Sequence, residues 1–170
     1  MTKITADNTD FRLLNEEIKA CPDTEIEVER CLGQRYIGAG SRQKTLTLTG
    51  IPGNALGAYL DGGTILTAGN AQDATGDTMN DGLIAVSGDC GDATGYSMRG
   101  GRIYVHGDAG YRAGIHMKQY GDNIPVLVIG GRAGSFLGEY LAGGRIIVLG
   151  LGGDGAEAPV GAFPGTGMHG

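Results

Sequence analysis

The chain has 170 residues, of which 34 are glycine and five are proline, and 41% are hydrophobic. Glycine is therefore far more frequent than the roughly 7% of an average protein, but the apolar fraction is sufficient for a hydrophobic core. Thirteen basic residues stand against nineteen acidic ones, a formal net charge of −6. This balance argues against sequence-independent binding to nucleic acid, which needs clustered positive charge.

The cysteines and the apolar segments indicate a soluble protein. Cys21, Cys31 and Cys90 are an odd number at spacings that match no metal or redox motif, which favours a reduced intracellular compartment. No stretch reaches the roughly 18 apolar residues of a membrane helix. Residues 1–6 lack the basic and apolar regions of a signal peptide. We therefore expect a cytoplasmic protein that binds no membrane.

An N-terminal segment, residues 1–25, is predicted to contain a short amphipathic helix over residues 9–20 and to cap the rest of the chain. Asn8 or Thr9 can cap such a helix, and Pro22 ends it. The helix would cover the first exposed edge of a sheet, which is otherwise an aggregation hazard. Its apolar positions, at helical spacing, are Phe11, Leu14 and Ile18.

Residues 26–150 are built on a period of nineteen residues, and this repeat predicts the architecture. One glycine series is Gly50, Gly69, Gly88 and Gly107, and another is Gly38, Gly57, Gly76, Gly95 and Gly114. An apolar series with the same step is Leu60, Met79, Met98 and Met117, and it is predicted to lie in the core. A fixed period of this length is typical of solenoid proteins.

Each unit contains one short alternating stretch, such as Ile103 and Val105 with Tyr104 and His106 between them, as in a strand buried on one face. Nineteen residues with several glycine corners leave no room for a helix. We therefore predict an all-β, single-stranded, right-handed parallel β-helix of about seven turns, because parallel crossovers are overwhelmingly right-handed. The inward positions predicted to stack are Leu46, Ile65, Ile84, Ile103, Val126 and Ile146.

The repeat is irregular at two places. The register slips by four residues through Lys118–Asn123, and one further residue follows at Gly131. Residues 151–170 form a glycine-rich C-terminal segment, expected to be an incomplete last turn that other residues or partners complete. Loops that interrupt a regular surface often carry function, so His116, Lys118 and Tyr120 are predicted to form part of a partner contact.

No residue pattern indicates an active site. The runs Gly38–Gly40 and Gly150–Gly155 are not followed by the helix that a dinucleotide-binding motif requires. The three histidines have no metal-site spacing. Aspartates gather at turns, where this residue commonly bonds its own backbone. The sequence therefore predicts no catalytic, cofactor-binding or metal-binding residue. These aspartates are Asp73, Asp77, Asp89, Asp92 and Asp108, and the histidines are His106, His116 and His169.

Several strings within the repeat resemble the GXGXG domain of the glutamate synthase large (alpha) subunit, in its stand-alone form. The resemblance extends from about Ile4 to Gly170. The strings that carry it are Gly33–Gly38, Gly69–Asp73, Met79–Gly82, Gly114–Lys118 and Phe136–Gly144.

The resemblance implies a structural role. In that family the domain is a right-handed β-helix beside a glutaminase domain and an FMN-binding synthase barrel. The parent reaction delivers ammonia from glutamine to 2-oxoglutarate, with reduction through FMN and an iron-sulphur cluster. This chain has no nucleophilic cysteine after Met1, no barrel and no cysteine cluster. The resemblance therefore implies that FMN, the cluster and catalysis belong to partner chains, a glutaminase-type amidotransferase and an FMN-binding synthase.

Two other functions are compatible with the repeat. One is the scaffold C subunit of a formylmethanofuran dehydrogenase, although the strings Gly114–Lys118 and Phe136–Tyr140 fit glutamate synthase better. The other is an independent carbohydrate-active β-helix enzyme, which would require paired acids and aromatic residues along one face. Copies of the chain could also associate through the ends of the coil.

Overall fold

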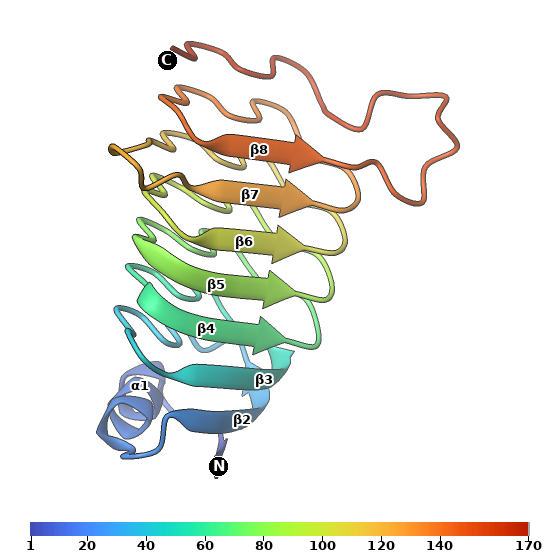
Figure 1. Ribbon diagram of the computed structural model, residues 1–170. Helices are drawn as coiled ribbons and strands as arrows, with labels where there is room; N and C mark the ends of the chain where they lie inside the picture. Colours follow the sequence, from blue (N-terminus) through green and yellow to red (C-terminus); the bar gives the residue numbers. More distant parts are fainter. Residues whose placement is uncertain (170) are drawn as a thin grey trace.

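The computed structural model describes residues 1–169, and its strands form one parallel sheet in which each strand pairs with the next along the chain (Figure 1). A single helix, α1, lies between the first two strands in sequence. The elements are β1 (Thr2–Thr5), α1 (Phe11–Ala20), β2 (Glu25–Leu32), β3 (Thr45–Ile51), β4 (Asp61–Thr67), β5 (Asp81–Val86), β6 (Arg102–Val105), β7 (Val126–Ile129) and β8 (Arg145–Val148).

Each turn of the coil contributes one strand and returns through a series of tight turns. In Figure 1 the strands run from left to right at the front while the chain climbs, so the coil is right-handed. The predicted single-stranded parallel β-helix of about seven turns is confirmed. Its core is a column of inward side chains, and the predicted series Leu60, Met79, Met98 and Met117 is fully buried within it.

Inward residues stack as predicted over the first strands of the repeat. Ile65 pairs with Ile84, and Ile84 with Ile103, while Val86 pairs with Val105 in the same layers. All three isoleucines are fully buried. Residues that are nineteen positions apart in sequence therefore lie directly above one another in the coil.

The prediction that Val126 continues this column is wrong, because Leu127 pairs with Ile103. The spacing 127 − 103 = 24 shows that all five inserted residues precede β7, rather than four before it and one at Gly131. The four residues of β7 are all apolar, so alternation could not assign its inward side. Backbone hydrogen bonds at both ends of the insertion set the register, from Lys118 to Met98 and from Val126 to Gly101.

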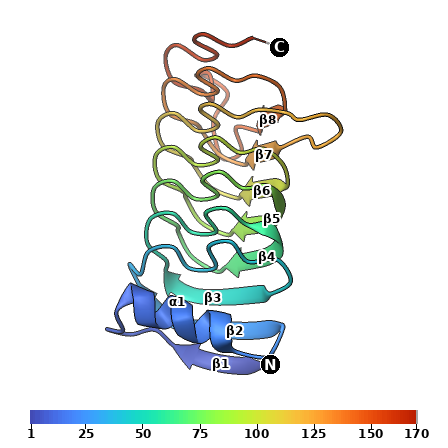
Figure 2. The same cartoon turned by 90° about the vertical axis from the view of Figure 1, so that its left-hand side faces the viewer.

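The N-terminal end contains both the predicted helix and a strand that was not predicted. α1 begins at Phe11 with Asp10 as its N-cap, because the Asp10 side chain accepts a hydrogen bond from the Arg12 N–H at 2.9 Å; the predicted caps Asn8 and Thr9 are wrong. Leu14 and Ile18 are buried in the core. β1 pairs with β2 and forms the edge of the sheet, with α1 beside it (Figure 2).

The C-terminal segment leaves the coil and then rejoins it. Residues 151–158 are exposed and project as a loop beyond the end of β8 (Figure 1). Val160 then pairs with Ala133, at a spacing of 160 − 133 = 27, which is the nineteen-residue period plus eight. From Val160 the chain therefore runs alongside the return path of the preceding coil. This is the part of the chain for which an incomplete last turn was predicted. Residue 170 lies outside the described range.

Every coil from β2 onward contains three alternate positions with a left-handed backbone, as at Tyr36, Gly38 and Gly40, whose φ angles are 61°, 70° and 66°. These corner segments stack in a column (Figure 2). At the middle position of the first three of these coils glycine avoids a clash with the core, since a methyl group on Gly57 would lie 2.6 Å from Ile84 Cδ1. The outer positions accept larger residues because their side chains point away from the core.

Candidate functional site

The outer face of the sheet changes character along the coil. Its residues in register, from β1 to β8, are Lys3, Glu27, Thr47, Leu66, Ala85, Tyr104, Val128 and Ile147. The first is charged and exposed, with Lys3 Nζ 2.8 Å from Glu27 and 2.9 Å from Glu29. From β4 onward every position is apolar or aromatic. We call these five residues, Leu66, Ala85, Tyr104, Val128 and Ile147, the outer strip.

The outer strip exposes apolar surface where a sheet facing water normally carries polar residues. Tyr104 is 41% exposed and Ile147 is 43% exposed. Leu149 and Leu151, also exposed, extend the surface beyond β8. A groove of about 470 Å³ runs between Tyr104, Val128 and these two leucines. Contiguous exposed apolar surface of this kind marks interaction sites.

Two loops border the C-terminal half of the sheet. The insertion before β7 lies at the start of that strand, and residues 151–158 project beyond the other end of β8 (Figure 1). The C-terminal part of the outer strip therefore has a loop on each side. The outer strip was not predicted from the sequence. One signal for it was present, because in β7 the outward residues are apolar as well as the inward ones.

The predicted residues Lys118 and Tyr120 lie together in the first of these loops. Lys118 Nζ is 5.0 Å from the centroid of the Tyr120 ring, and the Arg99 guanidinium carbon is 5.7 Å from it. Asn123 anchors the loop through a 3.0 Å hydrogen bond from its side-chain amide to the Asn80 carbonyl. All of the loop from Lys118 to Asn123 is exposed. Its role in a partner contact stays a prediction.

His116 belongs to a different cluster, on the corner column. Its backbone is left-handed, with φ 56°, and its ring stacks on Tyr140 with centroids 5.1 Å apart. Tyr96 meets the same ring edge-on at 6.0 Å. The structure thus places His116 in an exposed aromatic row, which stacks side chains from three successive coils.

Four of the five turn aspartates, Asp73, Asp89, Asp92 and Asp108, have a structural role that differs from the predicted one. Asp92 N–H donates to Asp73 Oδ1 at 2.9 Å, and Tyr111 N–H donates to Asp92 Oδ1 at 2.8 Å. These carboxylates therefore bond the backbone of the next coil, whereas bonding to their own backbone was predicted. The reason is the stack itself, which brings each equivalent N–H within reach of the preceding side chain.

Two of the three thiols, those of Cys31 and Cys90, are unreactive because they are buried. Burial raises the pKa of Cys31 to about 11 and that of Cys90 to about 12, so neither forms a thiolate at neutral pH. Cys21 is half-buried. Within residues 1–169, no group of three or more His, Cys, Asp or Glu side chains is placed to hold a metal ion.

A right-handed coil with one strand per turn defines a β-solenoid, and its outer strip is exposed apolar surface. The sequence matches the GXGXG motif family over residues 23–170, and the chain belongs to that family, whose domain is found in glutamate synthase large subunits. Among the three left-handed corner positions of each coil, the middle one is always glycine, as at Gly38, Gly57 and Gly76.

The chain is also similar to an uncharacterised protein of Methanocaldococcus jannaschii. The two are 53% identical over 176 aligned positions, which cover 98% of this chain and 67% of that protein. No solved structure matches this chain significantly. Over the described residues, no helix has the length and apolar character needed to cross a membrane.

Proposed function

We propose that this chain is a non-catalytic structural subunit or domain of a glutamate synthase complex in the cytoplasm. In this role it holds a glutaminase-type amidotransferase and an FMN-binding synthase in fixed relation. Membership of the GXGXG family supports the complex, and the exposed outer strip is the observation that carries the scaffold role. FMN and the iron-sulphur cluster would be held by the partner chains.

The coil is suited to a spacer because its backbone is bonded across every layer. At the corners, Tyr59 N–H donates to Asp77 O in the next coil at 2.8 Å, whereas Gly57 N–H donates to Ile37 O in the preceding coil at 2.9 Å. Alternate N–H groups thus tie each corner in both directions. Ammonia that passes between two active sites needs a sealed path, and a stiff spacer keeps the two sites aligned.

The outer strip gives the partner a defined position. Tyr104 and Ile147 supply exposed apolar area, and buried aromatic residues contribute strongly to protein interfaces. We place the contact of Lys118 and Tyr120 at the border of this interface, where their exposed loop precedes β7. His116 would contribute through the corner column.

The test is reconstitution with the cognate chains. We expect this chain to co-elute with them and to raise their glutamine-dependent formation of glutamate, while showing no turnover alone. Tyr104→Glu combined with Ile147→Glu should abolish co-elution. Thr47→Glu, at the equivalent exposed position of β3, is the matched control and should co-elute normally.

Circular dichroism should show that both variants remain folded, since the three side chains lie outside the core. Glutamine turnover by this chain alone, or full activity of the partner chains without it, would contradict the proposed function. Normal co-elution of the doubly substituted chain would show that the outer strip is not the interface.

A further inference from the structure

A cavity lies away from the outer strip, between α1 and the corner segment that leads into β3. Its volume is about 920 Å³, within the range of small-molecule sites. We propose that this cavity binds a small organic anion, with a phosphate or carboxylate group carried on a planar ring. The proposal goes beyond the scaffold role and does not depend on it.

Positive charge gathers in this cavity although the chain as a whole is acidic. Its lining contains four cationic side chains, Arg12, Lys19, Arg42 and Lys44, and one carboxylate, Glu16. Arg42 pairs with Asp61 at 3.1 Å. Lys19 forms no ion pair within residues 1–169, so its charge remains available to a ligand.

Lys44 is held in place while retaining a donor. Its Nζ donates to the carbonyl oxygens of Cys21 at 2.6 Å and Asp23 at 3.1 Å. An ammonium group has three donors, so one is left after these two bonds. Because backbone carbonyls fix the group, its position is set before any ligand arrives.

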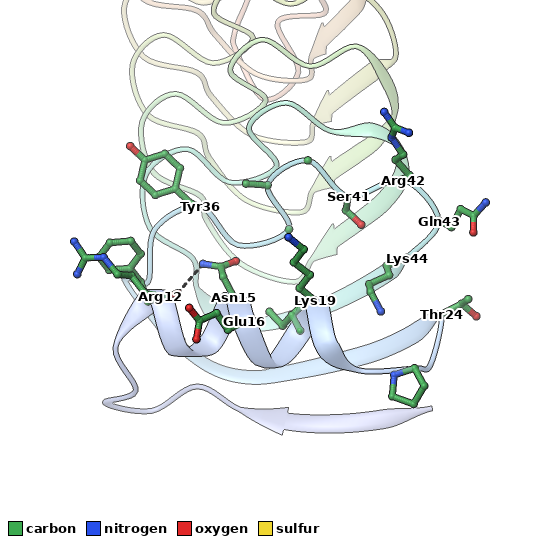
Figure 3. A pocket seen from close by; sticks show the side chains of 16 residues that line it. Arg12, Asn15, Glu16, Lys19, Thr24, Tyr36, Ser41, Arg42, Gln43 and Lys44 are labelled. Carbon is green, nitrogen blue, oxygen red and sulfur yellow. Dashed lines mark hydrogen bonds between the residues drawn. The ribbon is translucent and has the colours of Figure 1, made fainter.

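Ser41 lines the same end of the cavity. Ser41 Oγ is buried and has no hydrogen-bond partner among the described residues. A buried hydroxyl without a partner is unfavourable, and rotation of the Ser41 side chain toward the cavity would let it donate to an anionic oxygen there. Figure 3 shows Lys19 reaching up from α1 into the cavity, with Ser41 and Lys44 on one side of it and Tyr36 on the other.

The Tyr36 end of the cavity is aromatic. The rings of Phe11 and Tyr36 lie with their centroids 6.1 Å apart. The guanidinium carbons of Arg12 and Arg35 lie 4.7 Å and 5.0 Å from the Phe11 centroid, so two cations lie over that ring. Tyr36 is 46% exposed and offers a flat surface. A ligand with a ring at one end and an anionic group at the other matches both ends.

The experiment is a nuclear magnetic resonance titration of the full ¹⁵N-labelled chain with three probes: phenyl phosphate, benzoate and inorganic phosphate. We expect phenyl phosphate or benzoate to bind with a Kd below about 5 mM. The shifted amides should be confined to α1 and residues 36–44. The tighter of the two ring-bearing probes identifies the anionic group. Inorganic phosphate should bind at least about fivefold more weakly, because it lacks the ring contact.

Substitutions separate this site from general attraction of anions. Lys19→Gln should weaken binding by at least about fivefold, through loss of a charge-assisted hydrogen bond. Arg145→Gln, which removes an exposed cation outside the cavity, should leave the Kd unchanged. Equal weakening by both variants, equal binding of inorganic phosphate, or the absence of localised shifts with both ring-bearing probes would overturn the proposal.

Discussion

Asp89 Oδ1 accepts a hydrogen bond of 2.8 Å from the backbone N–H of Asp108, the equivalent residue one coil later. Asp89 N–H in turn donates to Asn70 Oδ1 at 2.9 Å, and Arg132 N–H donates to Asp108 Oδ1 at 2.7 Å. A ladder of side-chain acceptors thus crosses four coils. It satisfies backbone groups at the turn that follows each strand.

This ladder predicts that Asp89→Asn preserves stability and that Asp89→Ala does not. Asparagine keeps the Oδ1 acceptor, whereas alanine leaves the Asp108 N–H without a partner, which should cost about 1 kcal/mol in free energy of unfolding. Hydrogen exchange at the Asp108 amide measures the local effect. Exchange at the same rate in Asp89→Ala and the wild type would show that this hydrogen bond contributes nothing.

Two glycines with a left-handed backbone should differ in their tolerance of alanine. Gly82 has φ 102°, and a Cβ there would collide with the Gly63 carbonyl oxygen of the preceding coil. Gly152 has φ 79° but nothing within 4 Å of an added Cβ. Backbone strain of about 1 to 3 kcal/mol applies to both positions, so Gly82→Ala should lower the thermal unfolding midpoint more than Gly152→Ala. Equal midpoints would argue that the coils can shift apart to admit the methyl group.

The register of β7 predicts that alanine substitution lowers the free energy of unfolding more at one residue than at its neighbour. Leu127 is fully buried against Ile103, whereas Val126 is half-buried on the other side of the strand. Leu127→Ala should lower the free energy of unfolding by about 2 to 5 kcal/mol, because it leaves a cavity in the core. Val126→Ala should cost less in the same urea titration. The reverse order would place the inserted residues elsewhere.

Burial of Cys31 and Cys90 predicts a loss of stability in alkali. Unfolded thiols ionise near their ordinary pKa of 9.0, whereas in the folded chain the pKa is raised to about 11 and about 12. Above pH 9 the unfolded state therefore binds fewer protons, and the free energy of unfolding falls as the pH rises toward 11 to 12. Replacing both cysteines with alanine should flatten this slope. A thiol-specific reagent at pH 8 should modify only Cys21 until the chain is unfolded.

The insertion before β7 should be dispensable for folding. Replacing residues 119–125 with two glycines restores the nineteen-residue spacing and reproduces Gly143-Gly144 at the same position of the next coil. We expect a folded chain, judged by circular dichroism, that binds its partner chains more weakly because Tyr120 is gone. Tyr120→Ser in the intact loop is the matched variant. Unchanged partner binding in both would exclude the loop from the interface.

Most of the coil could be predicted from the sequence because residues one period apart in sequence contact each other in adjacent turns. A nineteen-residue period places Ile65, Ile84 and Ile103 in one column without any knowledge of distant contacts. The same argument failed at β7, where every residue is apolar and alternation carries no information. There the backbone hydrogen bonds at the two ends of the insertion determine the register.

The N-terminal strand and the functional surfaces depended on tertiary structure. β1 has only four residues, and it is ordered because β2 lies beside it. The outer strip becomes a surface only when strands 19 or 24 residues apart are placed side by side, because each coil supplies a single residue. Lys19, Ser41 and Lys44 share a cavity because α1 folds against the coil.

The sequence by itself determined the period, the single strand per turn, the buried methionine and leucine series and the absence of familiar catalytic motifs. Each follows from the type and spacing of neighbouring residues. Only the tertiary structure decided where the five inserted residues lie, that the aspartates bond the next coil, and which residues share the outer strip and the α1 cavity. These features arise between segments far apart in the chain, where packing and backbone hydrogen bonding select one arrangement among several that local spacing permits.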